Sequence, residues 1–437
     1  MHFHHHGYVS GDPRVQPAAG VGIDRPTQLP DEVDVLIVGT GPAGMLAAAQ
    51  LSQFPGVTTR IVERRAGRLA IGQADGIQAR VSRPSRPSAS RSGSSPRPTA
   101  SPRWHSGSRT PEPREDRPQR AHLDDPGGIS EFPHLIVNQA RVLDYFGEFM
   151  ANSPSRMAPD YGYEFVGLEV GEGEYPVSVT LLHTAGPDEG QTRTVRAKYV
   201  VGADGARSRV RASIGCTMAG DQANHAWGVM DVLANTDFPD IRLKCAIQSH
   251  DGGSILLIPR EGGHLFRMYV DLGEVPADDK GAVRKTTIEQ IIAKANAIIH
   301  PYTLDVRNVA WHSVYEVGHR LTDRFDDVLP EDLGTRTPRV FITGDACHTH
   351  SAKAGQGMNV SMQDGFNIGW KLGHVLEGRS PESLLSTYSA ERQVVAKNLI
   401  DFDKVWSTLM AKKPEEFENP PSSRTSMCAP PSSPRAL

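Results

Sequence analysis

A glycine-rich hexapeptide near the N-terminus, Gly39-Thr40-Gly41-Pro42-Ala43-Gly44, carries the clearest chemical signal in the chain. Gly39 permits a tight turn, Gly41 lets a pyrophosphate approach the backbone, and Gly44 allows a helix to pack closely on a sheet. The phosphate would then sit on the helix N-terminus, where free N–H groups and the helix dipole favour negative charge. Glu63, 24 residues after Gly39, is spaced to accept hydrogen bonds from a ribose hydroxyl. The pattern predicts a dinucleotide site; the alternative is a glycine turn needed only for packing.

Two further motifs lie far along the chain. Asp204-Gly205 follows the apolar run 200–203, and Gly344-Asp345 follows the run 340–343. A third glycine pair, in Gly355-Gln356-Gly357-Met358-Asn359, stands at the head of an expected helix. Taken singly, Asp-Gly indicates a turn and Gly-Asp indicates the end of a strand, so each alone is weak. Their order along the chain, after the glycine hexapeptide, makes them informative.

In this order the motifs resemble those of the class A flavoprotein aromatic hydroxylases, in the branch of phenol 2-monooxygenase and 3-hydroxybenzoate 4-monooxygenase. The resemblance extends over residues 31–80 and about 127–413. It implies an FAD-dependent monooxygenase in which NADPH or NADH reduces the flavin, O₂ adds to give a flavin hydroperoxide, and a phenolic substrate takes up one oxygen atom. Because the chain has one dinucleotide fingerprint, we expect NAD(P)H to bind only transiently.

The resemblance assigns FAD-binding roles to the matching positions. The hexapeptide with Glu63 matches the FAD fingerprint, and Asp204-Gly205 matches a segment used for both FAD and NAD(P)H. Asp345 matches an aspartate that binds the ribityl chain. A helix beginning near Gly355 would stabilise the negative charge of reduced flavin through its dipole and free N–H groups. The implied cofactor residues are Gly39, Gly41, Pro42, Ala43, Gly44, Glu63, Arg64, Gln73, Gln139, Asp204, Gly205, Gly344, Asp345, Gly355, Gly357, Met358 and Asn359.

The candidate catalytic base is Asp75. Its segment, Gly72–Arg80, resembles the one whose aspartate faces the phenol in phenol hydroxylases. A carboxylate shielded from water beside a phenol can accept the phenolic proton and increase electron density at the ring carbon to be hydroxylated. The alternative is a turn aspartate before Gly76. Arg260 and Tyr269 resemble the family's catalytic arginine and tyrosine, although their spacing of nine positions is one longer than in the phenol hydroxylase pattern.

Two cations bear on the choice of substrate, because phenol and hydroxybenzoate differ by a carboxylate. His134 and Lys244 resemble positions that hold this carboxylate in 3-hydroxybenzoate 4-hydroxylase. An ammonium and an imidazole facing an apolar ring site would favour an anionic substrate. The alternative for each is a surface or structural residue. Together they favour a 3-hydroxybenzoate-like substrate over phenol.

The hydrophobic pattern predicts the elements that must position these residues. Apolar runs at 34–38 and 58–63 flank an Ala/Leu-rich helix at 42–54, which is typical of a βαβ unit. Further strands are expected at 198–202, 254–259, 265–272 and 339–343, and helices at 286–299, 357–376 and 381–409. Ser380 is the expected N-cap of the last helix, with Pro381 at its first position. The expected fold is α/β, a Rossmann-like FAD-binding domain with a β-sheet substrate domain inserted.

The order of these elements predicts five segments. They are an N-terminal arm at 1–30, the first part of the FAD-binding domain at 31–216, a β-sheet substrate domain at 217–336, the second part of the FAD-binding domain with a long C-terminal helix at 337–413, and a disordered tail at 414–437.

Residues 81–126 interrupt the first segment with a tract of unusual composition. Its first forty positions, 81–120, hold nine Arg, eight Pro and ten Ser, too few apolar side chains to bury a core, so we expect disorder. Three explanations compete: a functional basic linker, a nucleic-acid arm, or a reading-frame error in a GC-rich gene. The resemblance implies a helical part of the pocket wall here and a thioredoxin-like domain after the last helix, and this sequence matches neither. A defective relative that binds FAD weakly or not at all is therefore the alternative function.

Composition bounds the remaining possibilities. The chain has 437 residues, a formal charge of −4 and four widely spaced cysteines, which fit neither a disulfide scaffold nor a zinc ribbon. The near-neutral balance favours no nucleic acid partner, and the sequence indicates no membrane segment, so we expect a soluble cytoplasmic protein. No metal site is expected, since the neighbouring ligands in Cys347-His348-Thr349-His350 rarely close a tetrahedron. The expected partners are a small aromatic substrate, O₂ and NAD(P)H, with a homodimer as the candidate assembly.

Overall fold

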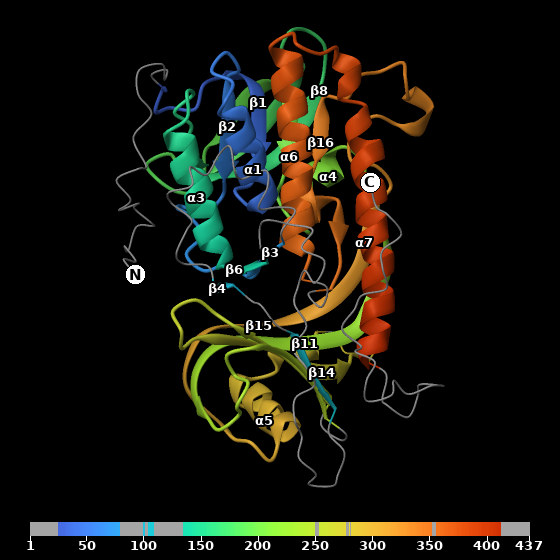
Figure 1. Cartoon of the computed structure of the whole chain (residues 1–437). Coiled ribbons are helices and arrows are strands. Elements are labelled where there is room, and N and C mark those ends of the chain that lie inside the picture. The colour runs from blue at the N-terminus through green and yellow to red at the C-terminus, as the bar shows by residue number, and fades with distance from the viewer. Residues whose placement is uncertain are drawn as a thin grey trace.

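The computed structural model describes residues 25–78, 99–100, 104–108, 134–249, 253–276, 279, 281–351 and 355–411. Within these residues, two large β-sheets form two lobes, and helix α7 (Thr387–Ala411) runs along the side of both (Figure 1). The first lobe contains a mostly parallel sheet covered by helices, and the second contains a curved antiparallel sheet. This architecture confirms the predicted α/β fold with a second, sheet-based domain.

Strand β1 (Glu32–Val38) lies in the middle of the first sheet, because its apolar run can be buried on both faces. It pairs in parallel with β2 (Thr59–Glu63) and with β10 (Thr192–Gly202), and β10 pairs in parallel with β16 (Val340–Ile342). The strand order is β7-β2-β1-β10-β9-β8, with β16 beside β10. The other strands are β7 (Asp160–Tyr161), β8 (Tyr163–Val170) and β9 (Val177–His183).

Two helices of the first lobe pack against α1 (Pro42–Leu51). At the crossing of α1 and α6 (Gly357–Leu376), a Cβ on Gly365 would lie 2.1 Å from the carbonyl oxygen of Ala43. The two backbones therefore touch, and only glycine leaves room for this approach. On its other side α1 packs against α3 (Gln139–Ala151). The N-terminus of α1 and the first half of α6 consequently behave as one rigid unit.

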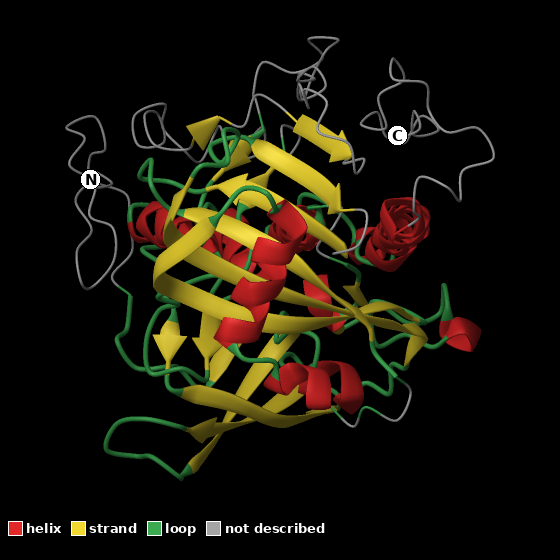
Figure 2. Cartoon of the chain, turned by 90° about the horizontal axis from the view of Figure 1, so that it is seen from below, coloured by secondary structure: helices red, strands yellow, loops and turns green. Residues whose placement is uncertain are grey.

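The second sheet curves around helix α5 (Ile288–Ile299), which crosses its outer face (Figure 2). Thr287 caps this helix: its side chain accepts a hydrogen bond from the Gln290 N–H, and the Gln290 side chain accepts one from the Thr287 N–H. The strand order is β17-β15-β11-β14-β13-β12-β5. Their bounds are β5 (Trp104–Ser108), β11 (Met218–Thr236), β12 (Lys244–Ser249), β13 (Gly253–Pro259), β14 (Phe266–Glu274), β15 (Leu304–Thr322) and β17 (His348–Thr349).

A small third sheet lies between the lobes (Figure 1). In it β6 (Leu135–Ile136) pairs with β3 (Gly76–Ile77) and with β4 (Thr99–Ala100). Both β4 and β5 fall in the 81–126 tract that we expected to be disordered, so the structure differs from that expectation at these residues. The reason is that backbone N–H and C=O groups can pair along a sheet edge whatever the side chains are. The rest of the tract, the 414–437 tail and residues 1–24 lie outside the described residues.

The start of the last helix was predicted wrongly. Pro381 has ψ of 155°, an extended conformation, and it precedes a short 3-10 turn, η4 (Glu382–Leu384), so α7 begins six residues later than predicted and Ser380 does not cap it. The hydroxyl of Tyr388 then donates to the Ile342 carbonyl at 2.8 Å and ties α7 to β16. The remaining short elements are α4 (Arg209–Ser213), η1 (Ala282–Lys285), η2 (Pro330–Asp332) and η3 (Gly344–Ala346).

A buried carboxyl beside β16 makes stability depend on pH. Asp326 is 4% exposed, and burial raises its pKa to about 6. Between about pH 4 and 6 the folded chain therefore binds more protons than the unfolded chain, so the free energy of unfolding falls as pH rises. Asp326→Asn, which keeps an oxygen for the Val328 N–H, is expected to gain up to about 3 kcal/mol over the parent at pH 7.5 and only about 1 kcal/mol at pH 4.5.

Urea unfolding at both pH values tests this expectation. Asp401→Asn, an exposed position on α7, is the control and should change stability equally at the two pH values. If Asp326→Asn also shifts stability by the same amount at both pH values, the carboxyl does not have the raised pKa that this prediction assumes.

Among the described residues, no helix is long and apolar enough to span a bilayer.

Candidate active site

Four neighbouring parallel strands of the first sheet bring the sequence motifs to one edge. Gly39 directly follows β1, Glu63 ends β2, Asp204 follows β10 and Asp345 follows β16. These strands are neighbours in the order β2-β1-β10-β16 and all run in the same direction. Because adjacent strands lie about 4.8 Å apart, their carboxyl ends place the three motifs side by side. This edge is the usual location of ligands in open α/β sheets.

The glycine loop fits a pyrophosphate. Gly39 has φ of 104°, and a Cβ there would lie 2.4 Å from the Ala203 carbonyl oxygen. A Cβ on Gly41, by contrast, would meet its nearest atom at 4.0 Å, so the loop is open on that side. Among the described residues no side chain caps the N-terminus of α1, and its first turn holds no acid. Its free amides and open backbone therefore suit a diphosphate group.

Glu63 is a buried anion beside this loop. Its carboxylate accepts hydrogen bonds from the Thr40 N–H at 3.1 Å and the Thr40 hydroxyl at 2.8 Å. Burial raises the pKa of Glu63, but the N–H and the guanidinium of Arg65 and the bonds from Thr40 more than compensate, so the pKa lies below its usual value. The arginine in contact with Glu63 is Arg65, at 2.9 Å, whereas the predicted Arg64 is exposed.

The two later aspartates have different surroundings. The Asp204 carboxylate accepts hydrogen bonds from the Ser208 hydroxyl at 2.5 Å and the Arg209 N–H at 2.7 Å, and so holds the turn before α4. Asp345 is exposed at the sheet edge, with the Ser361 hydroxyl 3.5 Å away. Gly344, beside it, has φ of 63°, where the left-handed region favours glycine. Of the two carboxylates, that of Asp345 is the one open to a ligand.

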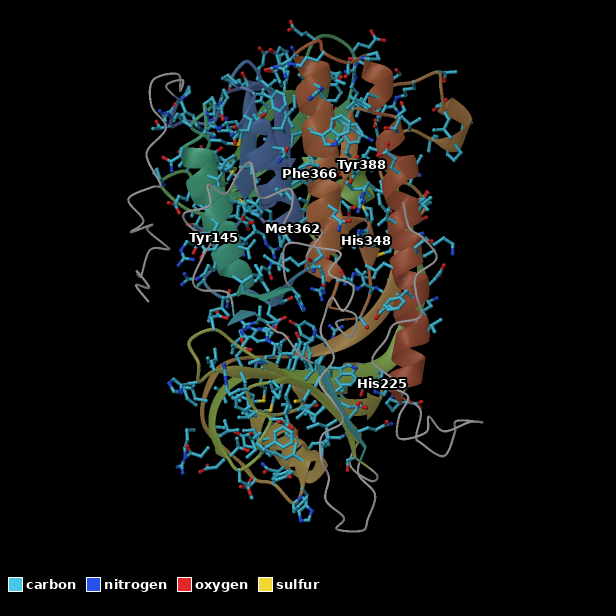
Figure 3. The ribbon with its side chains drawn as sticks, viewed as in Figure 1. Tyr145, His225, His348, Met362, Phe366 and Tyr388 are labelled. Carbon is cyan, nitrogen blue, oxygen red and sulfur yellow. The ribbon has the colours of Figure 1, made fainter. Side chains whose placement is uncertain are left out.

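A buried ion cluster centred on Asp364 contacts Gly344. Asp364 of α6 accepts hydrogen bonds from the Gly344 N–H at 3.2 Å and His348 Nε2 at 2.8 Å, and pairs with Arg392 at 2.5 Å. Burial raises the pKa of Asp364, but the charges and hydrogen bonds of Arg392 and His348 lower it by more. The pKa of Asp364 therefore lies below its usual value. Figure 3 shows His348 and Tyr388 between α6 and α7.

In the described part of the chain, no group of three or more His, Cys, Asp or Glu residues is placed to hold a metal ion.

The start of α6 is joined to the segment that carries Asp75. The fully buried Asn359 accepts a hydrogen bond from the Gln78 N–H at 2.8 Å and donates one to the Gly76 carbonyl at 3.0 Å. Within the described residues no side chain caps the N-terminus of α6, so the amides of Gly357 and Met358 are available to a ligand. The predicted helix start and the candidate base therefore belong to one rigid arrangement.

Gln139, at the start of α3, fixes the other side of this segment. Its Oε1 accepts hydrogen bonds from the N–H groups of Gln73 and Ala74, both at 3.0 Å. The Val137 N–H donates to the Asp75 carbonyl at 2.9 Å. The side chain of Gln73 is exposed. The backbone on both sides of Asp75 is thus held by the first lobe, while its carboxylate is directed to the second lobe.

The second sheet presents one face to Asp75. Alternate residues of a strand point to opposite faces, and Met268 and Val270 pack in the core around α5. Arg267 and Tyr269 of β14 consequently lie on the other face, as does Asp231 on β11. An apolar, largely aromatic cluster covers this face, formed by Ile136, Trp227, Val229, Leu256, Ile258 and Tyr269, with Trp311 and Tyr315 packed against it.

Two buried arginines surround the Asp75 carboxylate. Arg260 Nη1 lies 3.2 Å and Arg267 Nη1 lies 3.6 Å from Asp75 Oδ2, and both arginine side chains are 0% exposed. Among the described residues, no nitrogen of the Arg260 guanidinium has a hydrogen-bond acceptor. Burial, with the charge of Asp75, raises the pKa of Tyr269 to about 12, so its hydroxyl is protonated at neutral pH. The predicted trio of Asp75, Arg260 and Tyr269 is therefore brought together.

Sequence reasoning missed the pair that orients Arg267. Asp231 binds this guanidinium through two bonds, from Nε at 2.6 Å and from Nη2 at 2.8 Å, and Arg267 Nη1 donates to the Gln73 carbonyl. The Arg267 guanidinium also lies 4.9 Å from the ring centre of Trp311. Each charge is flanked by apolar residues, and a charged residue in such a position is rarely buried without a partner. That signal was present in the sequence, but the cross-strand pairing was not.

The two predicted carboxylate-binding cations are both buried, at 6% exposure each. The imidazole of His134 lies against Gly76, next to Asp75: a Cβ on Gly76 would be 3.1 Å from its Nε2. Lys244 begins β12 and shares the sheet face of Arg267, because the next residue, Cys245, packs toward α5. It lies two strands from Arg267, or about 10 Å across the sheet. Lys244 thus borders the aromatic face, and His134 lies beside the segment that carries Asp75.

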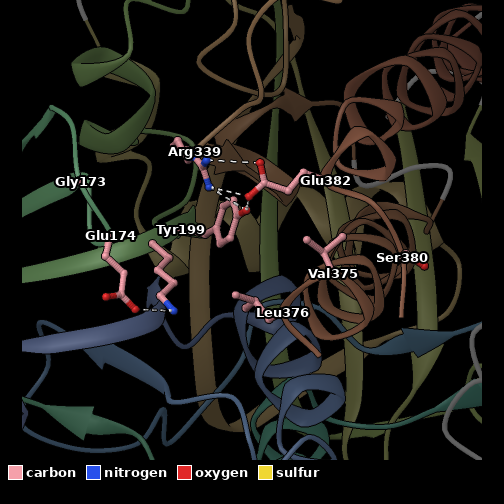
Figure 4. Close-up of a pocket in the computed structure, with 9 residues that line it drawn as sticks. Gly173, Glu174, Tyr199, Arg339, Val375, Leu376, Ser380 and Glu382 are labelled. Carbon is pink, nitrogen blue, oxygen red and sulfur yellow. Dashed lines mark hydrogen bonds and ion pairs between the residues drawn. The ribbon is translucent and has the colours of Figure 1, made fainter. Parts of the chain in front are cut away.

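A separate pocket of about 370 Å³ lies far from these residues (Figure 4). Leu376, at the C-terminal end of α6, lines it, so it is roughly 28 Å from the N-terminus of that helix. Its charged groups are already paired, Lys198 with Asp34 at 3.0 Å and Arg339 with Glu382 at 3.2 Å. Nothing in its lining resembles the motifs at the sheet edge.

Comparison with known proteins agrees with the geometry. Residues 32–403 match the family described as FAD binding domain. The 3-hydroxybenzoate 4-monooxygenase of Comamonas testosteroni is 49% identical over 425 residues, which cover 95% of this chain and 66% of that protein. A phenol 2-monooxygenase of Aspergillus fumigatus is 35% identical over 390 residues, covering 86% of this chain and 60% of that protein. This chain therefore spans 60% to 66% of the length of these curated relatives.

A solved structure shows a similar arrangement. The flavin-dependent monooxygenase PieE, in complex with FAD and substrate, superimposes with a TM-score of 0.67 at 25% identity, over 89% of this chain and 66% of that chain. The family match covers most of the sequence, and the glycine loop, the open N-terminus of α1 and the buried Glu63 fit the nucleotide that the family name implies. The chain belongs to the FAD binding domain family, in the class A aromatic hydroxylase group that its sequence motifs predict.

Proposed function

We propose that the chain is an FAD-dependent monooxygenase that hydroxylates a phenolic ring bearing a carboxylate, a 3-hydroxybenzoate-like compound, with NAD(P)H and O₂ as co-substrates. The single observation that carries the proposal is the position of Asp75. This buried carboxylate stands between a segment held by the start of α6 and an aromatic sheet face that carries two buried arginines. FAD, when bound and reduced by NAD(P)H, would supply the chemistry that activates O₂.

The residues around Asp75 are suited to activating a phenol. Its Oδ2 has no hydrogen-bond donor among the described residues and can accept the phenolic proton. Arg260 forms ion pairs with Asp75 at 3.2 Å and Glu261 at 3.5 Å, but its N–H groups make no hydrogen bond within the described part of the chain, so they can donate to the phenolate oxygen. The hydroxyl of Tyr269, protonated at neutral pH, is a second donor. Removal of the proton increases electron density at the ring carbon that is oxidised.

The aromatic face supplies binding and excludes water. Trp227 and Tyr269 are 6% and 8% exposed, and they offer a ring substrate a flat apolar surface. Exclusion of water strengthens the electrostatic interactions of the charged groups and prevents wasteful side reactions of the reduced cofactor. Both features favour an aromatic substrate over an aliphatic one.

The preference for a carboxylate rests on Lys244 and His134. Lys244→Met keeps most of the side-chain volume and removes the charge. We expect this change to raise KM for 3-hydroxybenzoate about 10- to 100-fold, the effect of losing a charge-assisted hydrogen bond, and to leave kcat/KM for phenol unchanged. Steady-state kinetics with both substrates measure the difference. Lys198→Met, in the distant pocket, is the matched control and should alter neither value.

The decisive experiment uses the full chain purified with FAD. We expect it to bind FAD and, with 3-hydroxybenzoate present, to consume NADH or NADPH and O₂ in step with hydroxylated product. Comparison of the two nucleotides gives the preferred donor. A chain that binds no FAD, or that oxidises NAD(P)H without product from any phenolic acid, would instead be the defective relative, and this proposal would be wrong. Sedimentation of the same sample tests the homodimer.

A further inference from the structure

Helix α7 carries a buried carboxylate that contacts both lobes. Asp403 is 0% exposed, and its Oδ2 accepts hydrogen bonds from the Ser351 N–H at 2.6 Å and from His319 Nε2 at 2.8 Å. Its Oδ1 accepts the Ser351 hydroxyl at 2.6 Å. His319 belongs to β15 of the second lobe, and Ser351 follows β17. One carboxylate therefore joins α7, the second sheet and the segment that leads to α6.

The bonding at Asp403 suits a carboxylate. A buried carboxylate is unfavourable unless donors replace the lost water, and here three donors do so. An asparagine could keep its oxygen toward the Ser351 N–H and His319, but its NH₂ group would then face the Ser351 hydroxyl, which could no longer donate to residue 403. The exchange also removes the negative charge that the three donors face.

His350 contacts both Ser351 and the start of α6. Its Nδ1–H donates to the Ser351 carbonyl at 2.9 Å, which fixes the orientation of the ring. That ring packs against Gly357, the first residue of α6: a Cβ on Gly357 would lie 3.1 Å from His350 Cε1. The His350 ring also stacks on His348, with 6.3 Å between ring centres and 15° between planes. The imidazole therefore supports the N-terminus of α6.

We propose that Asp403 is a positioning residue that holds the N-terminus of α6 in place for FAD, acting through Ser351 and His350. The uncapped amides of that helix start can stabilise an anionic group only if they point at it, because the effect of a helix terminus falls off within one turn. The inference rests on the proposed function for the identity of the ligand. It adds that α7, which forms no part of the nucleotide motifs, controls how well the cofactor is held.

Asp403→Asn in the full chain tests the proposal, with FAD itself as the probe. We expect the Kd for FAD, measured by flavin fluorescence on the apoprotein, to rise about 5- to 30-fold, the range that a displaced helix terminus gives. The visible absorption bands of the bound flavin should shift as well. Asp401→Asn is the matched control: it lies on the same helix, 55% exposed in an ion pair with Lys397, and should leave both readouts unchanged.

Ser351→Ala is the second variant, since it removes one hydroxyl and keeps the N–H. We expect a smaller rise in Kd, and the double variant should bind no more weakly than Asp403→Asn alone, because both act on one path. Additive effects, or a wild-type Kd in Asp403→Asn, would overturn the inference and leave the proposed function intact. A wild-type chain that binds no FAD would overturn both, and a chain that binds FAD without hydroxylating any phenol would overturn only the proposed function.

Discussion

Asp75→Asn is expected to lower the rate of product formation about 100- to 10,000-fold, the usual contribution of a general base. Asparagine has the same shape, so it can fill the space beside Arg260 and Arg267, but it cannot accept the phenolic proton. FAD affinity should stay unchanged, because the side chains of Gln139 and Asn359 hold the backbone of the Asp75 segment. Chromatography of the hydroxylated product, alongside NAD(P)H consumption, measures the effect.

The chain provides a matched control for this change. Asp144 forms an ion pair with Arg68 of the same 3.2 Å length, also in the first lobe, and Asp144→Asn should keep the wild-type rate. Because NAD(P)H oxidation and hydroxylation are measured together, a loss of the chemical step is distinguished from a loss of flavin reduction. Full product formation by Asp75→Asn would show that the carboxylate is the turn aspartate that the sequence left as the alternative.

Gly365→Ala is expected to lower the free energy of unfolding by about 1–3 kcal/mol or more. The new methyl group would stand 2.1 Å from the backbone oxygen of Ala43, and a backbone atom cannot rotate away as a side chain can. α6 and α1 must therefore separate, which moves the glycine loop away from the edge of the sheet. We expect weaker FAD binding as a second consequence. Urea unfolding of the apoprotein measures the first effect and flavin fluorescence the second.

Gly147→Ala is the control, because it makes the same change inside a helix of the same lobe. Gly147 lies in α3, and the nearest atom to its added Cβ would be Met45 Cε at 3.9 Å, an ordinary contact. Alanine favours the helix over glycine, so this variant should be more stable by about 0.5–1 kcal/mol. If both variants changed stability in the same direction, close approach of the two backbones would not explain the effect at Gly365.

The predicted sheet edge shows how far local pattern reaches. Glu63 and Asp345 are separated by hundreds of positions, yet each follows a short apolar run that is typical of a buried parallel strand. Strands that run in parallel within one sheet have their carboxyl ends on the same side, so the motifs were expected to gather once the runs were identified. The start of α6 was also predicted at the correct residue, because glycines precede an apolar run with helical periodicity.

The pairings between distant charges were not predictable in this way. Asp231 and Arg267 face each other only because β11 and β14 pair in one particular register, and a shift of one residue would turn them to opposite faces. The contact of Asp403 with Ser351 likewise depends on the path of α7 across both lobes. The strand β5 likewise lies in a tract whose composition carries no strand pattern, and it forms where that tract pairs in parallel with β12.

By itself the sequence determined the α/β class, the nucleotide loop with its acid, and the membership in a hydroxylase family. Each of these depends on contacts between residues close in the chain, or on glycines whose backbone freedom no other residue has. Only the tertiary structure decided which charges surround Asp75, which carboxylate at the sheet edge is open, and how α7 reaches α6. Those contacts join residues far apart in the chain, and their geometry follows from the packing of whole elements rather than from any local pattern.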